Sequence, residues 1–150
     1  MGFFSEAGKL TAYGKKFVKM YSDCKSLKAE VGFEGDYETG LPVSQVAAWQ
    51  EFGTSNIPAR PFMRQAVRRN KLEIIKAARN EFNRQLKGDC NAKRVLEAEG
   101  KETSLFVVDE INRGDFVPNA PATVAKKGHD HPLIDTCKLR MSVTYNIVEK

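Results

Sequence analysis

The longest regular pattern of apolar positions runs from Phe62 to Leu86 and predicts an amphipathic helix. Its buried arc is expected to hold residues that recur at helical intervals: Met63, Val67, Ile74, Ile75, Ala78, Phe82 and Leu86. Arg69, Lys76 and Lys87 line the opposite side of this helix. That side is either a solvated face or a basic face that meets a partner protein or a DNA backbone.

A weaker helical pattern spans Phe3 to about Cys24. Gly8 and Gly14 interrupt it, and each destabilises a helix by about 1 kcal/mol relative to alanine. Residues 1–26 are therefore expected to form either a docked helix or a helical arm that orders against a neighbouring molecule.

Two stretches alternate between apolar and polar residues, which is typical of half-buried strands. They are Leu27 to Phe33 and Leu139 to Val148, and we expect them to pair antiparallel. Because two strands alone are only marginally stable, the helix that starts at Phe62 is expected to pack over their apolar face. The pattern predicts an α+β fold, with a small antiparallel sheet against a long amphipathic helix, shorter helices and long loops. The length of 150 residues predicts a single domain.

A short helix is predicted from Gln45 to Phe52. Ser44 is its candidate N-cap, with Val43 or Pro42 as the alternative start of the helix. Its apolar residues point broadly one way, so we expect them, including the only tryptophan, in the core: Val46, Ala47, Trp49 and Phe52.

A stiff corner, residues 51–62, follows this short helix. Gly53 is expected to end the helix with a positive φ. Pro58 and Pro61 fix their own φ and restrict the residues before them to extended conformations. Pro61 also suits the start of the next helix, because the first helical turn does not use its missing N–H. The corner is therefore predicted to hold what it presents in a fixed position.

The region between the long helix and the second strand is less regular. Gly88 and Asp89 are expected to end the long helix, and residues 92–98 to add a short turn that Gly100 interrupts. The stretch from Thr103 to Asn112 suits either a helix or a strand. Residues 113–136 are rich in Pro, Gly, Asn and Ala and predict a long loop, and a structureless connection of that length is normally functional or mobile.

Charge is distributed unevenly along the chain. The net charge is +5, but Arg60 to Arg94 contains eleven Lys or Arg against three acidic residues, so this stretch carries +8 and the remainder −3. Such asymmetry indicates either a nucleic-acid patch or a basic face that meets an acidic face on a partner or on a second copy.

The three cysteines, Cys24, Cys90 and Cys137, are odd in number and far apart, which favours reduced thiols of a protein made in a cytoplasm. No apolar run reaches the roughly 18 residues of a membrane span, and the N-terminus lacks the apolar core of a secretory signal.

Two groups of motifs carry a family resemblance. The first is AWQEFGT at residues 48–54, followed by IPARPFMR at residues 57–64. The second is NA at 119–120, TVA at 123–125, KG at 127–128 and PLIDTCKLRMSVTY at 132–145. In this order and spacing they resemble the signature of the neck and tail-completion proteins of long-tailed bacteriophages, a group that includes virion-morphogenesis and tail-component proteins. The resemblance covers most of the chain from about Val31, and the family usually has glycine where this chain has Cys137.

This resemblance implies a structural virion protein with no enzymatic activity. It implies a subunit of the phage neck that forms a homo-oligomeric ring, most simply a sixfold (hexameric) one, at the head–tail junction. Such a ring completes the tail and allows head–tail joining and DNA passage. The implied partners are the neighbouring head-connector and tail-tube proteins, with transient contact to DNA in the lumen and none to a membrane. Assembly would take place in the cytoplasm of the host bacterium. The resemblance also favours a helix for Thr103 to Asn112.

Candidate interface residues lie in the corner, on the basic side of the long helix and in the long loop: Glu51, Phe52, Ile57, Arg60, Phe62, Arg64, Arg69, Lys76, Asn119, Lys127 and Asp135. Arg60 sits between the constraints of two prolines, and Arg64 lies in a first helical turn, where a cation opposes the helix dipole. Arg60 either caps carbonyls or pairs with Glu51 in its own fold. Otherwise these arginines form bidentate salt bridges to carboxylates of the adjacent subunit.

Candidate chemistry is confined to His129, Asp130 and His131, with Asp135 and Cys137 nearby. Two histidines separated by one residue project to the same side of an extended chain, and Asp or Cys would complete a tetrahedral zinc site. The tract is a polar loop and the family pattern has no such histidines, so we expect ordinary loop residues, no metal and no cofactor. Neither a P-loop nor a GxSxG motif occurs, which leaves catalysis unsupported.

An alternative function is a nucleic-acid-binding module that uses the basic stretch from Arg60 to Arg94. Because phosphate contacts release counterions, this alternative predicts binding that weakens strongly with salt.

Overall fold

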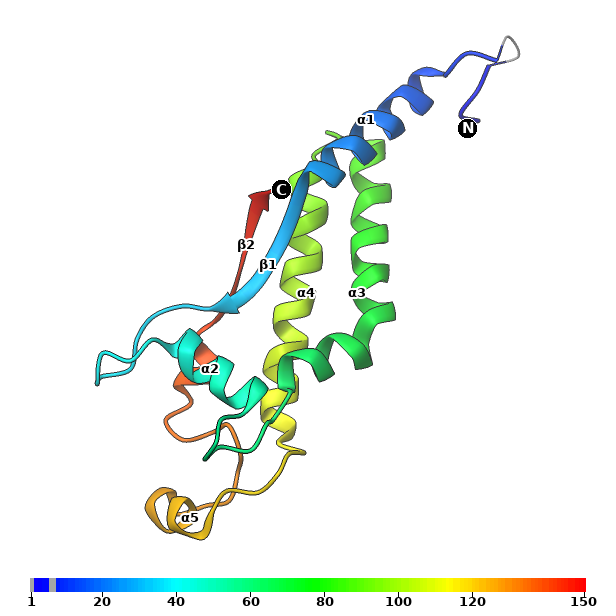
Figure 1. Cartoon of the computed structure of the whole chain (residues 1–150). Helices are drawn as coiled ribbons and strands as arrows, with labels where there is room; N and C mark the ends of the chain where they lie inside the picture. The colour runs from blue at the N-terminus through cyan, green and yellow to red at the C-terminus, as the bar shows by residue number, and fades with distance from the viewer. Residues whose placement is uncertain (1, 6–7) are drawn as a thin grey trace. The chain divides into compact units, whose positions relative to one another are not determined.

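The structure is a computed structural model that describes residues 2–5 and 8–150. Figure 1 shows the elements of this part of the chain, which follow one another in this order: α1 (Ala12–Ser26), β1 (Leu27–Phe33), α2 (Val43–Phe52), α3 (Phe62–Lys87), α4 (Ala92–Arg113), α5 (Pro121–Lys127), α6 (Lys138–Met141) and β2 (Val143–Glu149). Within the described residues, no helix combines the length and the apolar character that crossing a bilayer requires.

The predicted α+β fold is confirmed. β1 has the predicted bounds and pairs antiparallel with β2 in a two-stranded sheet. Contacts divide the chain into two compact units. The first unit comprises Met1–Glu30, Leu72–Glu102 and Asn146–Lys150, and the second comprises Val31–Lys71 and Thr103–Tyr145. The single domain stays a prediction, because contact density alone does not decide whether the units fold separately.

The second unit has its own buried core, built from α2, the start of α3, the end of α4 and α6: Val43, Ala47, Phe62, Ala66, Val107, Ile111 and Leu139. Val31 and Phe33 of β1 pack against this core, and the Phe33 ring meets the Phe62 ring edge-on at a centroid distance of 5.9 Å. The start of α3 therefore covers the apolar face of the sheet in this unit, as expected.

The core of the first unit is smaller and consists of Met20, Leu86, Val95 and Leu96. Phe17 and Phe82 extend it with an edge-to-face contact at 5.4 Å between ring centroids. Leu27 and Ile147 bring the two strands into the same cluster.

The helix predicted from Phe3 begins only at Ala12. Thr11 is its N-cap, and its hydroxyl accepts a hydrogen bond from the Gly14 N–H at 3.1 Å. The residues before Thr11 that the structure describes turn back on themselves, with Phe4 and Leu10 forming an isolated bridge. Gly14 stands where a Cβ would collide with the Phe3 carbonyl, so this glycine marks a close approach of backbone rather than a weak helix. Ala7, within the predicted helix, lies outside the described residues.

The long helix is confirmed, but its predicted buried arc is wrong at Val67 and Ile75, which are 45% and 43% exposed. Asn70 has the non-helical angles φ −110° and ψ 15°, and its side-chain amide donates to the Ala66 carbonyl at 2.9 Å. This bend changes the phase of the helix. The residues before and after the bend belong to the cores of different units.

A single helix, α4, replaces the predicted short turn at residues 92–98 and the break at Gly100. Gly100 is buried inside this helix. Burial of Val95, Leu96, Val107 and Ile111 on either side offsets the roughly 1 kcal/mol that a glycine costs in a helix. The helix favoured for Thr103 to Asn112 is confirmed as its second half.

The predicted loop of residues 113–136 contains the helix α5. This helix starts with Pro121 in its first turn and ends at Gly128, which has the left-handed angles φ 79° and ψ 1°. The predicted second strand, from Leu139, begins only at Val143. Residues 138–141 form α6, which buries Leu139, and Cys137 before it has a φ of 61°.

The helix α2 starts at Val43, with Pro42 as its N-cap, so Ser44 is not the cap and the alternative start is confirmed. Its buried residues are Val43, Ala47 and Glu51, spaced four apart. Phe52 is 69% exposed, so its predicted place in the core is wrong. Trp49 is half-buried and is not a member of either core cluster of the described residues.

Candidate interface at the proline-stiffened corner

The inner side of the corner is held by the buried carboxylate of Glu51, which is 4% exposed. Its oxygens accept hydrogen bonds from the backbone N–H of Met63 at 2.8 Å and of Arg64 at 3.2 Å. Both donors lie in the first turn of α3, where backbone N–H groups lack partners within the helix. Glu51 therefore caps α3 from the end of α2, and its negative charge complements the helix dipole.

Arg64 completes this arrangement. Its Nε donates to the Glu51 carboxylate at 2.8 Å and its second guanidinium nitrogen to the Glu51 carbonyl at 2.9 Å. The carboxylate neutralises the cation that would otherwise oppose the helix dipole. The predicted salt bridge of Arg64 is therefore made within its own fold.

Arg60 joins the corner to the segment after α4. Its guanidinium donates to the Val117 carbonyl at 2.9 Å, the Pro118 carbonyl at 3.1 Å and the Gln50 side chain at 2.7 Å. A longer contact of 3.4 Å reaches the Asn119 side chain. Arg60 is 5% exposed, so it caps carbonyls in its own fold and is not available to a neighbouring subunit. Burial lowers the pKa of the guanidinium, and the nearby Asp130 carboxylate opposes that shift.

The outer loop of the corner is stiffened as the prolines and Gly53 predict. Gly53 has a φ of 77°, and a Cβ there would lie 2.9 Å from the Ala59 nitrogen. The Thr54 hydroxyl accepts from the backbone N–H of Asn56 at 3.2 Å and of Ile57 at 3.1 Å. The outward side of this rigid loop carries Phe52, whose ring lies 5.2 Å from the Arg64 guanidinium carbon.

The structure separates the predicted interface residues into two groups. Glu51, Arg60 and Phe62 are buried in the second unit, where their side chains serve its own packing and bonding, and their place in an interface stays a prediction. The others are exposed or half-buried: Phe52, Ile57, Arg64, Arg69, Lys76, Asn119, Lys127 and Asp135.

Besides Arg64, which is bonded to Glu51, two more of these exposed cations are already paired. Arg69 donates to the buried carboxylate of Glu110 at 2.7 Å, and Lys76 lies 3.4 Å from Glu73. In the same way, Arg84 pairs with Glu81 at 2.7 Å, and Arg94 approaches Asp89 at 4.0 Å. Of these pairs, only Arg64–Glu51 and Arg69–Glu110 use carboxylates from outside residues 60–94, so this bonding within the fold lowers the local charge of +8 by two.

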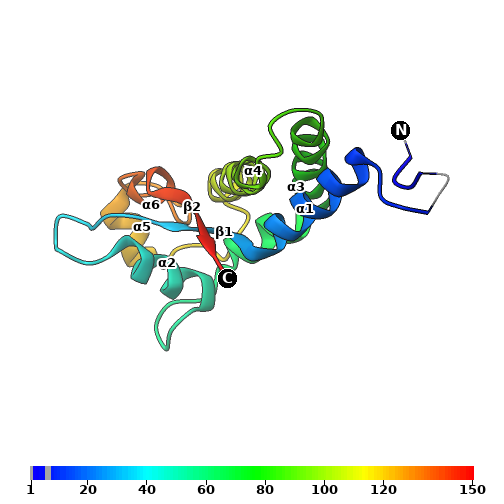
Figure 2. The same cartoon turned by 90° about the horizontal axis from the view of Figure 1, so that it is seen from above.

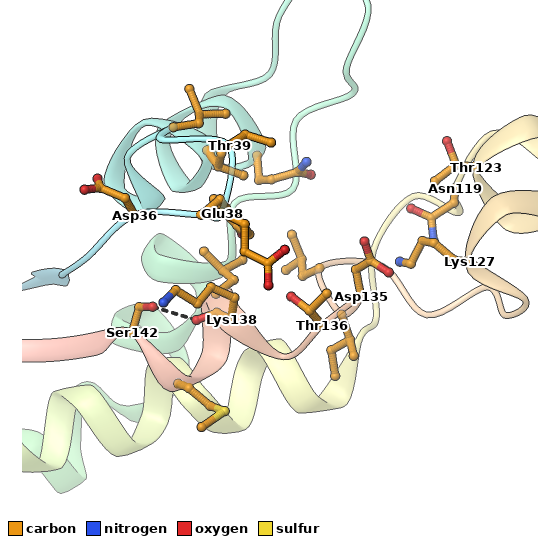
Figure 3. Close-up of a pocket in the computed structure, with 18 of the residues that line it drawn as sticks. Asp36, Glu38, Thr39, Asn119, Thr123, Lys127, Asp135, Thr136, Lys138 and Ser142 are labelled. Carbon is orange, nitrogen blue, oxygen red and sulfur yellow. Dashed lines mark hydrogen bonds between the residues drawn. The ribbon is translucent and has the colours of Figure 1, made fainter.

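A cavity of about 1060 Å³ opens beside the corner, within the second unit. Figure 3 shows Asp36, Glu38 and Thr39 on one side and Asn119 and Lys127 on the other. Lys127 is tied to the His131 carbonyl at 2.8 Å. The wall thus combines carboxylates, ammonium groups and apolar side chains.

Tyr37 lines this cavity and packs against the core of the second unit. Burial raises the pKa of its phenol, and the nearby Asp135 carboxylate raises it further. Tyr37 is thus an anchor of the loop that carries Asp36 and Glu38.

The histidine tract is used in local structure. The His131 ring nitrogens lie 3.0 Å from the Pro132 carbonyl and 3.1 Å from the Asn112 carbonyl, and His129 Nδ1 accepts from the His131 N–H at 3.2 Å. The His131 ring also packs on Gly114, where a Cβ would lie 2.6 Å from it. Among the residues that the structure describes, no three His, Cys, Asp or Glu side chains gather as metal ligands.

Sequence reasoning missed Gln50, Glu110 and the carbonyls of Val117 and Pro118. The carbonyls carry no side-chain signal. Glu110 did carry a sequence signal. It stands beside Ile111 on the apolar face of its helix, where a buried carboxylate needs a cation.

Comparisons with protein-family models, with curated proteins and with solved structures gave no match to this chain. The phage resemblance therefore enters the function as a proposal.

Proposed function

We propose that this protein is a structural subunit of a tailed-phage neck, which forms a homo-oligomeric ring at the head–tail junction. In this role it completes the tail, joins it to the head connector and lets DNA pass without turnover of a substrate. The sequence resemblance of residues 48–64 and 119–145 motivates this proposal.

The observation that carries the proposal is the construction of the corner. Its inner side is fully bonded through Glu51 and Arg60, whereas its outer side exposes Phe52. A large aromatic side chain on a rigid loop supplies contact area at a low cost in conformational entropy, which suits a protein–protein contact. Cys137 adds support, because its φ of 61° is a conformation that glycine favours, and glycine is the residue usual in the family.

The test is particle assembly. Phage assembly without this polypeptide should leave heads and tails unjoined. The purified chain should then add as a ring to the ends of such tails in electron micrographs. Normal head–tail joining in its absence, or turnover of a substrate by the isolated chain, would overturn the proposal.

The alternative, a nucleic-acid-binding module, uses the cations of Arg60 to Arg94. Arg60 is buried, and the exposed side chains of Arg64 and Arg69 are already paired with Glu51 and Glu110, which weakens their attraction for phosphate. A gel-shift experiment with duplex DNA in about 50 mM salt separates the two functions, because a phosphate-binding module binds tightly under these conditions. We expect no shift.

A further inference from the structure

The second unit exposes a basic face at the corner and the start of α3, defined by Phe52, Arg64, Val67, Arg68 and Lys71. Arg64, Val67 and Arg68 are spaced three and four apart and share one side of the helix. The ion pairs of the described residues give no acidic partner to Arg68 or Lys71. The face therefore combines unpaired positive charge with exposed apolar side chains.

The same unit exposes an acidic face on the loop between β1 and α2, defined by Glu34, Asp36, Glu38 and the neighbouring Met141. The Glu34 N–H donates to the Ser142 carbonyl at 2.9 Å, which places Met141 beside the loop. Met141 is 77% exposed. The ion pairs of the described residues include none of the three carboxylates. The Nζ of Lys138 lies 4.0 Å from where a Cβ on Gly35 would stand, so this one cation partly offsets the three carboxylates.

The acidic loop is ordered. The Val43 N–H donates to the Gly35 carbonyl at 3.0 Å and the Tyr37 N–H to the Leu41 carbonyl at 2.9 Å. Tyr37 packs against the core, whereas its neighbours Asp36 and Glu38 are exposed. The carboxylates are thus presented from a fixed backbone.

We propose that the basic face of one copy binds the acidic face of a second copy. This inference rests on the proposed ring-forming function and names the surfaces that build the ring. Opposite charges guide the encounter and set the register, and burial of the apolar side chains on both faces supplies affinity.

The position of the two faces suits a ring. The acidic loop precedes α2 and the corner follows it, so the loops leave opposite ends of α2 and project in different directions (Figure 2). A contact between two different faces of one chain is heterologous. Each added copy leaves one basic and one acidic face open, and the assembly ends only when a ring closes.

Charge reversal tests this contact by sedimentation velocity of the full chain at about 100 µM in low salt. The wild-type chain should form a closed oligomer. Arg68→Glu with Lys71→Glu, and separately Glu34→Lys with Glu38→Lys, should each weaken assembly by about tenfold or more, since like charges then face each other. Mixing the two double variants, or combining all four changes in one chain, should restore the oligomer.

A matched control reverses two exposed lysines of α1, Lys15→Glu with Lys19→Glu, and should leave assembly unchanged. An oligomer that survives both face reversals overturns this inference but leaves the proposed ring intact. A wild-type chain that stays monomeric overturns it too. If that monomer binds duplex DNA through Arg68 and Lys71, the basic face serves nucleic acid instead, and the proposed function falls with it.

Discussion

Glu51 shows how one residue serves two elements. Its carboxylate lies at the end of α2 and accepts two backbone N–H groups from the first turn of α3, besides the Arg64 side chain. We expect Glu51→Ala to lower the free energy of unfolding by about 2–3 kcal/mol, because buried donors lose their acceptor. Urea unfolding followed by circular dichroism measures this loss.

The matched control is Glu73→Ala. Glu73 is exposed and pairs with Lys76 at 3.4 Å on the surface of α3. Because exposed ion pairs contribute little, this change should shift the free energy of unfolding by no more than about 0.5 kcal/mol. Equal effects of the two substitutions would show that Glu51 is not a structural cap.

Tyr37 predicts a change of stability at alkaline pH. Its pKa is raised in the folded protein, first by burial and then by Asp135, so the folded state holds the phenol proton more tightly than the unfolded chain does. The stability that Tyr37 contributes is complete below the ordinary phenol pKa of about 10 and is lost as the pH rises above it. The difference in unfolding free energy between wild type and Tyr37→Phe should thus be constant below pH 9 and fall above pH 10. A difference that stays constant to pH 11 would contradict this assignment.

At the scale of elements, the corner depends on one backbone conformation. Gly53 has a φ of 77°, and a Cβ would lie 2.9 Å from the Ala59 nitrogen and 3.0 Å from the Ile57 carbonyl oxygen. We expect Gly53→Ala to destabilise the protein by about 1–3 kcal/mol, as measured by thermal or urea unfolding.

Gly32→Ala is the control for this change. Gly32 lies inside β1, where an added Cβ meets nothing within 4 Å. Alanine there should be neutral or stabilise the strand by up to about 1 kcal/mol, because glycine loses more conformational entropy on folding. The two glycine substitutions should therefore differ in sign, and a loss of stability at both positions would argue against a strained corner.

The elements that sequence predicted well are those whose pattern depends on local periodicity. β1 has its predicted bounds, and α2 and α3 have the expected places, because alternation and helical spacing are local properties. The predicted ends of helices were wrong where a capping hydrogen bond or tertiary burial determined them. The N-cap at Thr11 delays α1, and burial on both sides of Gly100 keeps α4 continuous.

The candidate site was predictable in its stiffness but not in its bonding. The prolines, which fix φ, and the glycine, which permits a positive φ, predict a rigid corner. The partners of Arg60 are carbonyls more than fifty residues away along the chain, which no pattern of side chains reveals. The same holds for Val67 and Ile75, whose exposure follows from the bend at Asn70.

At the scale of the whole molecule, the described residues form two buried cores, and the main elements contribute to both units. α3, α4 and both strands each contribute residues to both units. Since a helix or strand that unfolds in one unit loses its continuation in the other, we expect a single cooperative unfolding transition.

Trp49, the only tryptophan, lies in the second unit, so its fluorescence reports that unit alone, whereas far-ultraviolet circular dichroism reports both. The two signals should give coincident urea midpoints. Separate midpoints would show that the units unfold independently and would count against the prediction of a single domain.

In the corner, different residues stabilise the fold and form the outer surface, and this separation has an evolutionary consequence. The side chains that hold it, Glu51 and Arg60, point inward, and their neighbours at positions 52 and 55–57 are not part of either core cluster of the described residues. Substitutions at these outer positions should therefore affect folding less than substitutions of Glu51 or Arg60. A lineage is therefore able to exchange one binding specificity for another on an unchanged scaffold.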